Sequence, residues 1–195
     1  MADIRDYYAV CVAALLLVMV IYGYWVTGRT YGALFDDRRK ISLSRFQVII
    51  WSVLVLSAFV AAALYMRTAD ITVPENVWAL MGITVGSAAG SNMLKSAPAM
   101  QDKLRRNTED AKGSLRDMLE DESKDTLPTV DVGKLQMLLI TLVVWVSYAY
   151  ALWEWDLAVN GHQMPEISGG VVTLIGISHA GYLTVKGQKL LVGGA

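Results

Sequence analysis

Cysteine and histidine are scarce in this chain of 195 residues, which contains one cysteine and two histidines. The single cysteine, Cys11, excludes an intramolecular disulfide bond and any metal site that needs several cysteines. His162 falls in a loop between two apolar segments, and no second histidine or carboxylate lies at the depth of His179. We therefore expect no metal site.

Catalytic and nucleotide-binding motifs are also missing from the sequence. It contains no phosphate-binding loop, dinucleotide fingerprint, nucleophile elbow or pair of acidic residues within the apolar segments. We therefore expect neither an enzyme nor a bound cofactor. The net charge is only −1 at pH 7, and the few basic residues are mixed with acids and adjoin apolar segments, so we expect no nucleic-acid partner.

Apolar residues, by contrast, make up 54% of the chain, which is too many for an ordinary soluble domain of this size. A helix needs roughly 20 residues to cross the hydrocarbon core of a bilayer. The sequence predicts an all-α integral membrane protein with five transmembrane helices. The third and fifth segments are short and rich in glycine, so the alternative for each is to enter the membrane without crossing it. The apolar segments are about 8–27, 46–66, 76–91, 135–153 and 167–185.

Lysine and arginine mark the cytoplasmic loops of membrane proteins. Here they gather between the first and second segments, between the third and fourth, and after the fifth, while only Arg5 and Arg67 remain for the other side. This distribution requires five crossings, with the N-terminus outside and the C-terminus in the cytoplasm. We therefore expect a multi-pass protein of the bacterial inner membrane.

An internal repeat is indicated by segments 43–64 and 132–153, which match in character along their whole length. Each is followed by a loop, a Pro-Glu pair and a helix of small residues, and both copies would have the same orientation in the membrane. The chain then divides into a first membrane helix with a cytoplasmic linker (1–42), hairpin repeat 1 (43–95), a charged cytoplasmic loop (96–131) and hairpin repeat 2 with the C-terminal tail (132–195).

Small residues recur at every fourth position of the third apolar segment. Gly82, Gly86 and Gly90 would share one helix face, and such faces let helices approach closely in membranes. The partner is either the fifth helix, with Gly176 and Ala180, or a second subunit. We expect a glycine-zipper contact in either case.

One titratable side chain, His179, falls within an apolar segment. Intramembrane ionisable residues are functional candidates because burying them is costly. We consider two alternatives: a proton-handling site, or a neutral histidine that bonds a serine or a carbonyl on a neighbouring helix. A stripe of hydroxyls, formed by Thr84, Ser87 and Ser91, adjoins the glycine face of the third segment. These hydroxyls could either bond carbonyls of their own helix or line a narrow polar path.

Matching cation-x-Gln pairs begin the two repeats, Arg45 with Gln47 and Lys134 with Gln136. Such residues commonly extend to lipid phosphates and fix the helix end. The alternative is a paired site for an anionic headgroup or ligand between the repeats.

The patterns favour a non-catalytic, oligomeric membrane protein that works as a scaffold, an anchor or a subunit of a larger assembly. The alternative is an ion- or proton-conducting channel, or a small transporter, built on the glycine-rich third and fifth helices. Expected partners are the lipid bilayer and either further copies of the chain or other membrane subunits.

Overall fold

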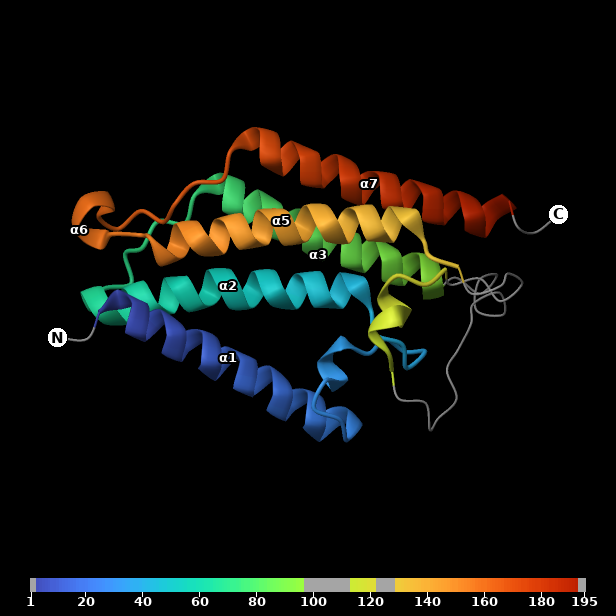
Figure 1. Cartoon of the computed structure of the whole chain (residues 1–195), viewed down its shortest axis with the longest axis horizontal. Helices are drawn as coiled ribbons and strands as arrows, with labels where there is room; N and C mark the ends of the chain where they lie inside the picture. The colour runs from blue at the N-terminus through green and yellow to red at the C-terminus, as the bar shows by residue number, and fades with distance from the viewer. Residues whose placement is uncertain (1–2, 97–112, 122–128, 193–195) are drawn as a thin grey trace.

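The computed structural model describes residues 3–96, 113–121 and 129–192 (Figure 1). Five long helices dominate these ranges, and three short helical turns connect them. The long helices are α1 (Ile4–Thr27), α2 (Leu43–Met66), α3 (Glu75–Ser96), α5 (Val132–Trp153) and α7 (Gly169–Val192). The short elements are η1 (Gly32–Leu34), η2 (Leu115–Met118) and α6 (Leu157–Asn160).

Four of the long helices, α1, α2, α3 and α5, are long and apolar enough to cross a membrane. This confirms the predicted all-α protein with apolar, membrane-length helices. α7 has 24 residues but is not among the four, and its sequence includes His179, Lys186 and several glycines. The fifth crossing and the orientation therefore stay predictions. Parts of the charged loop, with Lys103, Arg105 and Arg106, lie outside the described residues.

Local sequence explains where the helices begin and end. Gly28 ends α1 in a left-handed conformation with a φ of 71°, which glycine adopts without steric penalty. Pro74 directly precedes α3, and its carbonyl accepts a hydrogen bond from the amide of Val77. Asp131 caps α5, because its side chain accepts a hydrogen bond from the amide of Lys134 at 3.2 Å.

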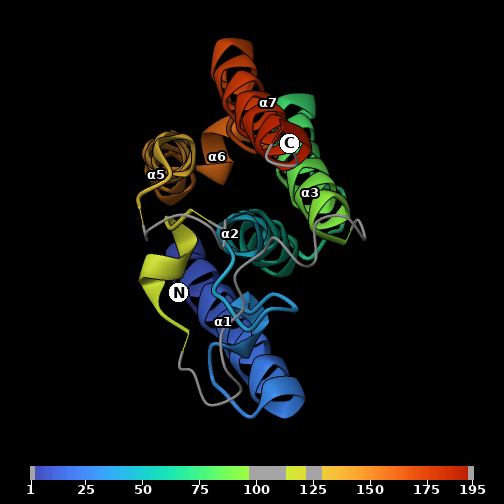
Figure 2. The ribbon, with the colours of Figure 1, turned by 90° about the vertical axis from the view of Figure 1, so that its right-hand side faces the viewer.

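The helices lie side by side with α2 in the middle (Figure 2). α1 packs on one side of α2, while α3 and α5 pack on its other sides, and α7 covers α3 and α5. We name the two ends of this bundle after one residue at each. The Arg5 end carries the start of α1 and the connections 67–74 and 154–168. The Lys95 end carries the segment 28–42 and η2 (Figure 1).

α3 and α7 run in parallel and contact each other through their glycines. A Cβ atom at Gly176 would lie 3.6 Å from Cδ1 of Ile83, and one at Gly90 would lie 3.4 Å from Cδ1 of Leu183. Each helix thus places a branched apolar side chain over a glycine of the other. The spacing between the two contacts is the same along both helices, as a parallel pair requires.

The interior is apolar in the middle of the bundle and toward the Arg5 end. Trp51 is fully buried there, and its ring is tilted by 40° relative to the ring of Tyr148. The indole of Trp145 donates a hydrogen bond to the carbonyl of Ile50 at 3.0 Å. A smaller apolar cluster at the Lys95 end joins segment 28–42 to η2, α5 and α7. Its buried members are Phe35, Ile41, Leu43, Met118, Met137 and Tyr182.

Candidate functional site

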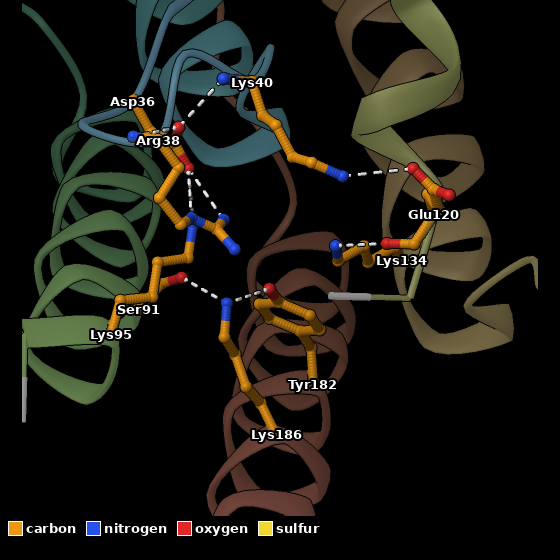
Figure 3. A network of polar contacts seen from close by, with 9 residues as sticks. All are labelled: Asp36, Arg38, Lys40, Ser91, Lys95, Glu120, Lys134, Tyr182 and Lys186. Atoms are coloured by element: carbon orange, nitrogen blue, oxygen red, sulfur yellow. Dashed lines mark hydrogen bonds and ion pairs between the residues drawn. The ribbon is translucent and has the colours of Figure 1, made fainter. Parts of the chain in front are cut away.

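Polar side chains of the interior gather toward the Lys95 end. They come from the first turns of α2 and α5, from the last turns of α3 and α7, and from segment 28–42. We call the charged and hydroxyl groups that contact one another there the charge cluster (Figure 3). Its members are Asp36, Arg38, Lys40, Ser91, Lys95, Glu120, Lys134, Tyr182 and Lys186.

Asp36 accepts hydrogen bonds from both side-chain and backbone donors in the charge cluster. Arg38 donates to it from Nη2 at 2.7 Å and from Nε at 3.0 Å, and Lys95 of α3 approaches to 3.5 Å. The backbone amides of Arg38 and Lys40 donate to its other oxygen at 3.0 Å and 3.1 Å. Burial alone would raise the pKa of Asp36, but the charges of Arg38 and Lys95 and these hydrogen bonds outweigh burial and lower it.

Glu120 connects the segment that follows η2 to the rest of the charge cluster through hydrogen bonds. Its carboxylate accepts a hydrogen bond from Nζ of Lys40 at 3.2 Å, and its backbone carbonyl accepts one from Nζ of Lys134 at 2.8 Å. A Cβ atom at Gly113, two residues before η2, would overlap the ring of Phe35, so the start of η2 also lies directly against segment 28–42. Only a residue without a side chain fits there.

Lys186 joins α7 to α3 within the charge cluster. Its Nζ donates to Oγ of Ser91 and to the hydroxyl of Tyr182, each at 2.9 Å. The ammonium also lies 5.3 Å from the centroid of the Tyr182 ring, a favourable cation–π distance. Lys186 is only 8% exposed, so these contacts replace water that the buried ammonium has lost.

The charge cluster is closed. The cavity bounded by Arg38, Lys95, Lys134 and Tyr182 has a volume of about 10 Å³, which is room for about one water molecule. Residues from segment 28–42, η2 and four helices line this space. The arrangement therefore holds these segments in fixed positions and leaves too little room for a ligand.

The predicted glycine face divides into two parts. Gly82 and Gly86 are exposed, and a Cβ atom at either would meet nothing within 4 Å. Ala180 is exposed as well. The close contact between α3 and α7 within the chain uses only Gly90 and Gly176. Among the residues that the structure describes, none packs closely on Gly82 or Gly86.

His179 is 3% exposed, and in the described part of the chain neither ring nitrogen has a hydrogen-bond partner. The bond to a serine or a carbonyl that one alternative predicts is therefore not formed there. Among the hydroxyls, Thr84 donates to the carbonyl of Met81 in its own helix, and Ser91 belongs to the charge cluster. Ser87 is buried, and its Oγ has no partner in the described part.

The four residues of the predicted headgroup site are separated by the structure. Arg45 and Gln136 are exposed, whereas Gln47 and Lys134 are 1% and 4% exposed. Nε2 of Gln47 donates to Oγ1 of Thr141 at 2.8 Å and so joins α2 to α5. Arg45 and Lys134 thus occupy different environments although the sequence aligns them.

Most members of the charge cluster were not among the predicted site residues. The available signal was the presence of Lys95 and Lys186 at the ends of glycine-rich helices, where a buried ammonium needs acceptors. Hydropathy alone does not show that these lysines point inward.

Comparison of the chain with protein-family models, with curated proteins and with solved structures gives no match.

Proposed function

We propose that this chain is a non-catalytic membrane protein that serves as a scaffold, an anchor or a subunit of a larger assembly. The observation that carries the proposal is the closed charge cluster at the Lys95 end. Its buried ions contact one another and the protein's own hydroxyl and carbonyl groups around a cavity of about 10 Å³. Groups held in this way are suited to keeping a surface rigid, and a rigid surface is what a docking partner requires.

The proposed orientation puts the Lys95 end in the cytoplasm of a bacterium. All cations of the charge cluster belong to this end, and Arg29, Arg39 and Arg45 lie near it, in agreement with the positive-inside rule. α7 would then be the fifth crossing, parallel to α3. Its buried stripe of Ile175, His179, Tyr182 and Lys186 faces the other helices rather than lipid.

The proposed assembly is supported by the outward face of α3. Gly82 and Gly86 are exposed on it, and small residues allow close approach between helices in a bilayer. A second copy of the chain or another membrane subunit would supply the second helix.

Gentle detergent extraction from native membranes tests this function. We expect a particle that contains several copies of the chain or a stoichiometric partner, measured by light scattering and protein identification. A lone monomer that carries ion flux in liposomes would contradict the scaffold.

One observation favours the alternative function, a proton or ion path along α3 and α7. His179 and Ser87 are buried polar groups without partners in the described residues, and Ser91 and Lys186 follow them toward the Lys95 end. Buried ionisable groups within membranes often belong to such paths. Flux measured in liposomes across a pH gradient, with and without His179→Gln, decides between the two functions.

A further inference from the structure

A groove of about 620 Å³ lies between the last turns of α1, η1 and the first turns of α2. Its volume is in the range of sites that hold small molecules. α1 and α2 are close at the Arg5 end and diverge toward the Lys95 end, and η1 lies between them where they are farthest apart (Figure 1). The groove is therefore at the level where a membrane surface would cross the bundle.

Close backbone contact fixes one wall of the groove. A Cβ atom at Gly23 would lie 2.8 Å from the amide nitrogen of Ala33, so η1 lies against α1 without an intervening side chain. Oγ1 of Thr27 donates to the carbonyl of Gly23 at 2.7 Å and lies where a Cβ atom on Gly32 would be, so η1 meets α1 through a second glycine. The groove thus follows from the packing of η1 on α1.

The lining has an apolar part and a basic part. Met19, Val26 and Ile49 form apolar surface on the facing sides of α1 and α2, within segments that are apolar enough to span a membrane. The basic part carries three guanidinium groups, those of Arg29, Arg39 and Arg45. This combination matches an amphipathic ligand with a negative headgroup.

Positive charge prevails in the basic part. Arg45 is exposed in the first turn of α2 and makes no hydrogen bond or ion pair within the described residues. Two carboxylates also line the groove, but Asp36 is held by Arg38 and Lys95, as described above. Asp37 is the exposed one and opposes an anion. With three arginines and two aspartates in the lining, the groove has a formal charge of +1, which favours an anion.

We propose that the groove binds one anionic phospholipid from the adjacent membrane leaflet. The headgroup phosphate contacts Arg45, with Arg29 and Arg39 beside it, and the acyl chains lie along Met19, Val26 and Ile49. Arginine suits this role because its fork of N–H donors fits two phosphate oxygens. A free phosphate ion would leave the apolar part of the lining unused, so the lipid is the better fit.

The test is native mass spectrometry of the full chain, exchanged into micelles with equal amounts of phosphatidylglycerol and phosphatidylcholine. We expect one phosphatidylglycerol to be retained in preference to phosphatidylcholine. Arg45→Gln should weaken this retention about fivefold, the effect of one basic residue near an anionic membrane surface. Asp37→Asn removes the opposing charge at the same groove and should strengthen retention.

A matched control is Arg67→Gln, which removes an exposed arginine at the Arg5 end and should leave the preference unchanged. Val26→Trp fills the apolar part and should reduce lipid retention while Arg45 is intact. Equal retention of the two lipids, or an Arg45→Gln variant that behaves as wild type, overturns the proposal. Displacement of the lipid by inorganic phosphate at the same concentration also overturns it, since the ligand would then be the free ion.

Discussion

Lys186 on α7 and Ser91 on α3 are joined by a hydrogen bond of 2.9 Å inside the bundle. The bond lies within one turn of the contact of Gly90 with Leu183, so the two helices are held there by a polar contact next to the apolar one. Both partners are buried, at 8% and 1% exposure. The bond therefore replaces hydration that neither group can recover while folded.

We expect Ser91→Ala to destabilise the protein by about 1 kcal/mol, because the buried ammonium loses one of its acceptors. The measurement is the midpoint of thermal unfolding in detergent. Thr184→Ala is the control, since the hydroxyl of Thr184 is exposed and bonds only the carbonyl of Ala180 in its own helix. Equal effects of the two substitutions on the unfolding midpoint would show that the hydrogen bond between the helices does not contribute to stability.

Removal of the Asp36 charge should lower the free energy of unfolding at neutral pH and leave it unchanged in acid. Its folded pKa lies below the usual value of 3.8, so its contribution to stability is complete above about pH 4 and is lost as the pH falls through the folded pKa. We expect Asp36→Asn to lose about 3–5 kcal/mol at pH 7, the cost of breaking a buried pair. The difference from wild type should narrow toward pH 3.

Denaturant unfolding at several pH values measures this difference. Asp37→Asn serves as the neighbouring control, because Asp37 is exposed and its removal should change stability by less than about 1 kcal/mol. A gap between wild type and Asp36→Asn that stays constant from pH 7 to pH 3 would rule out the proposed role of the carboxylate.

Two leucine substitutions on the glycine face of α3 distinguish a contact within the chain from a contact with a second subunit. Gly90→Leu places a side chain against Leu183 within the chain and should lower folding yield or thermal stability. A Cβ atom at Gly86 would meet nothing within 4 Å in the described residues, so Gly86→Leu should leave the monomer folded. If a second subunit packs on this face, only Gly86→Leu dissociates the particle while the chain remains folded, as seen by light scattering.

An intact particle with Gly86→Leu would indicate that this face contacts lipid. The scaffold would then need a different interface, and the exposed glycines would have no role in assembly.

His179 gives a prediction that separates the two functions. A buried imidazole without hydrogen-bond partners is an unfavourable group, so His179→Leu should leave stability unchanged or raise it if the residue is only packed. If the residue carries protons, His179→Leu and His179→Gln should both abolish a pH-dependent flux between roughly pH 5 and 8 while the particle persists. Flux in liposomes and thermal unfolding, measured on the same preparations, test both outcomes.

The sequence predicted the helices well because long apolar segments have few alternatives. The third segment was expected at about 76–91, yet α3 continues to Ser96, and the second and fourth helices begin before their apolar segments. In α3 and α5 the extra turns carry Lys95 and Lys134, whose ammonium groups find acceptors in the interior. Apolar patterns cannot predict turns that polar contacts stabilise.

The site was less predictable for a related reason. Arg45 and Lys134 have the same chemical character and the same place in the repeat, but one points to the surface and the other inward. The direction in which each side chain points depends on how its helix is rotated against its neighbours. That rotation is set by contacts with residues far away in the sequence. Val85 has the position in the first predicted repeat that His179 has in the second, and Val85 is exposed whereas His179 is buried. Whether the two hairpins are true repeats stays a prediction.

The two loops at the Arg5 end pair with each other through their backbones. The amide of Thr72 donates to the carbonyl of His162 at 2.9 Å, and the carbonyl of Thr72 accepts from the amide of Met164 at 3.0 Å. The hairpin of α2 and α3 is therefore tied to that of α5 and α7 at this end by two strand-like bonds and at the other by buried ions. Two hairpins that are connected at both ends should unfold together. Amide hydrogen exchange in α2, α3, α5 and α7 should therefore give one shared free energy of opening. α1, joined to this unit along one side, should exchange sooner.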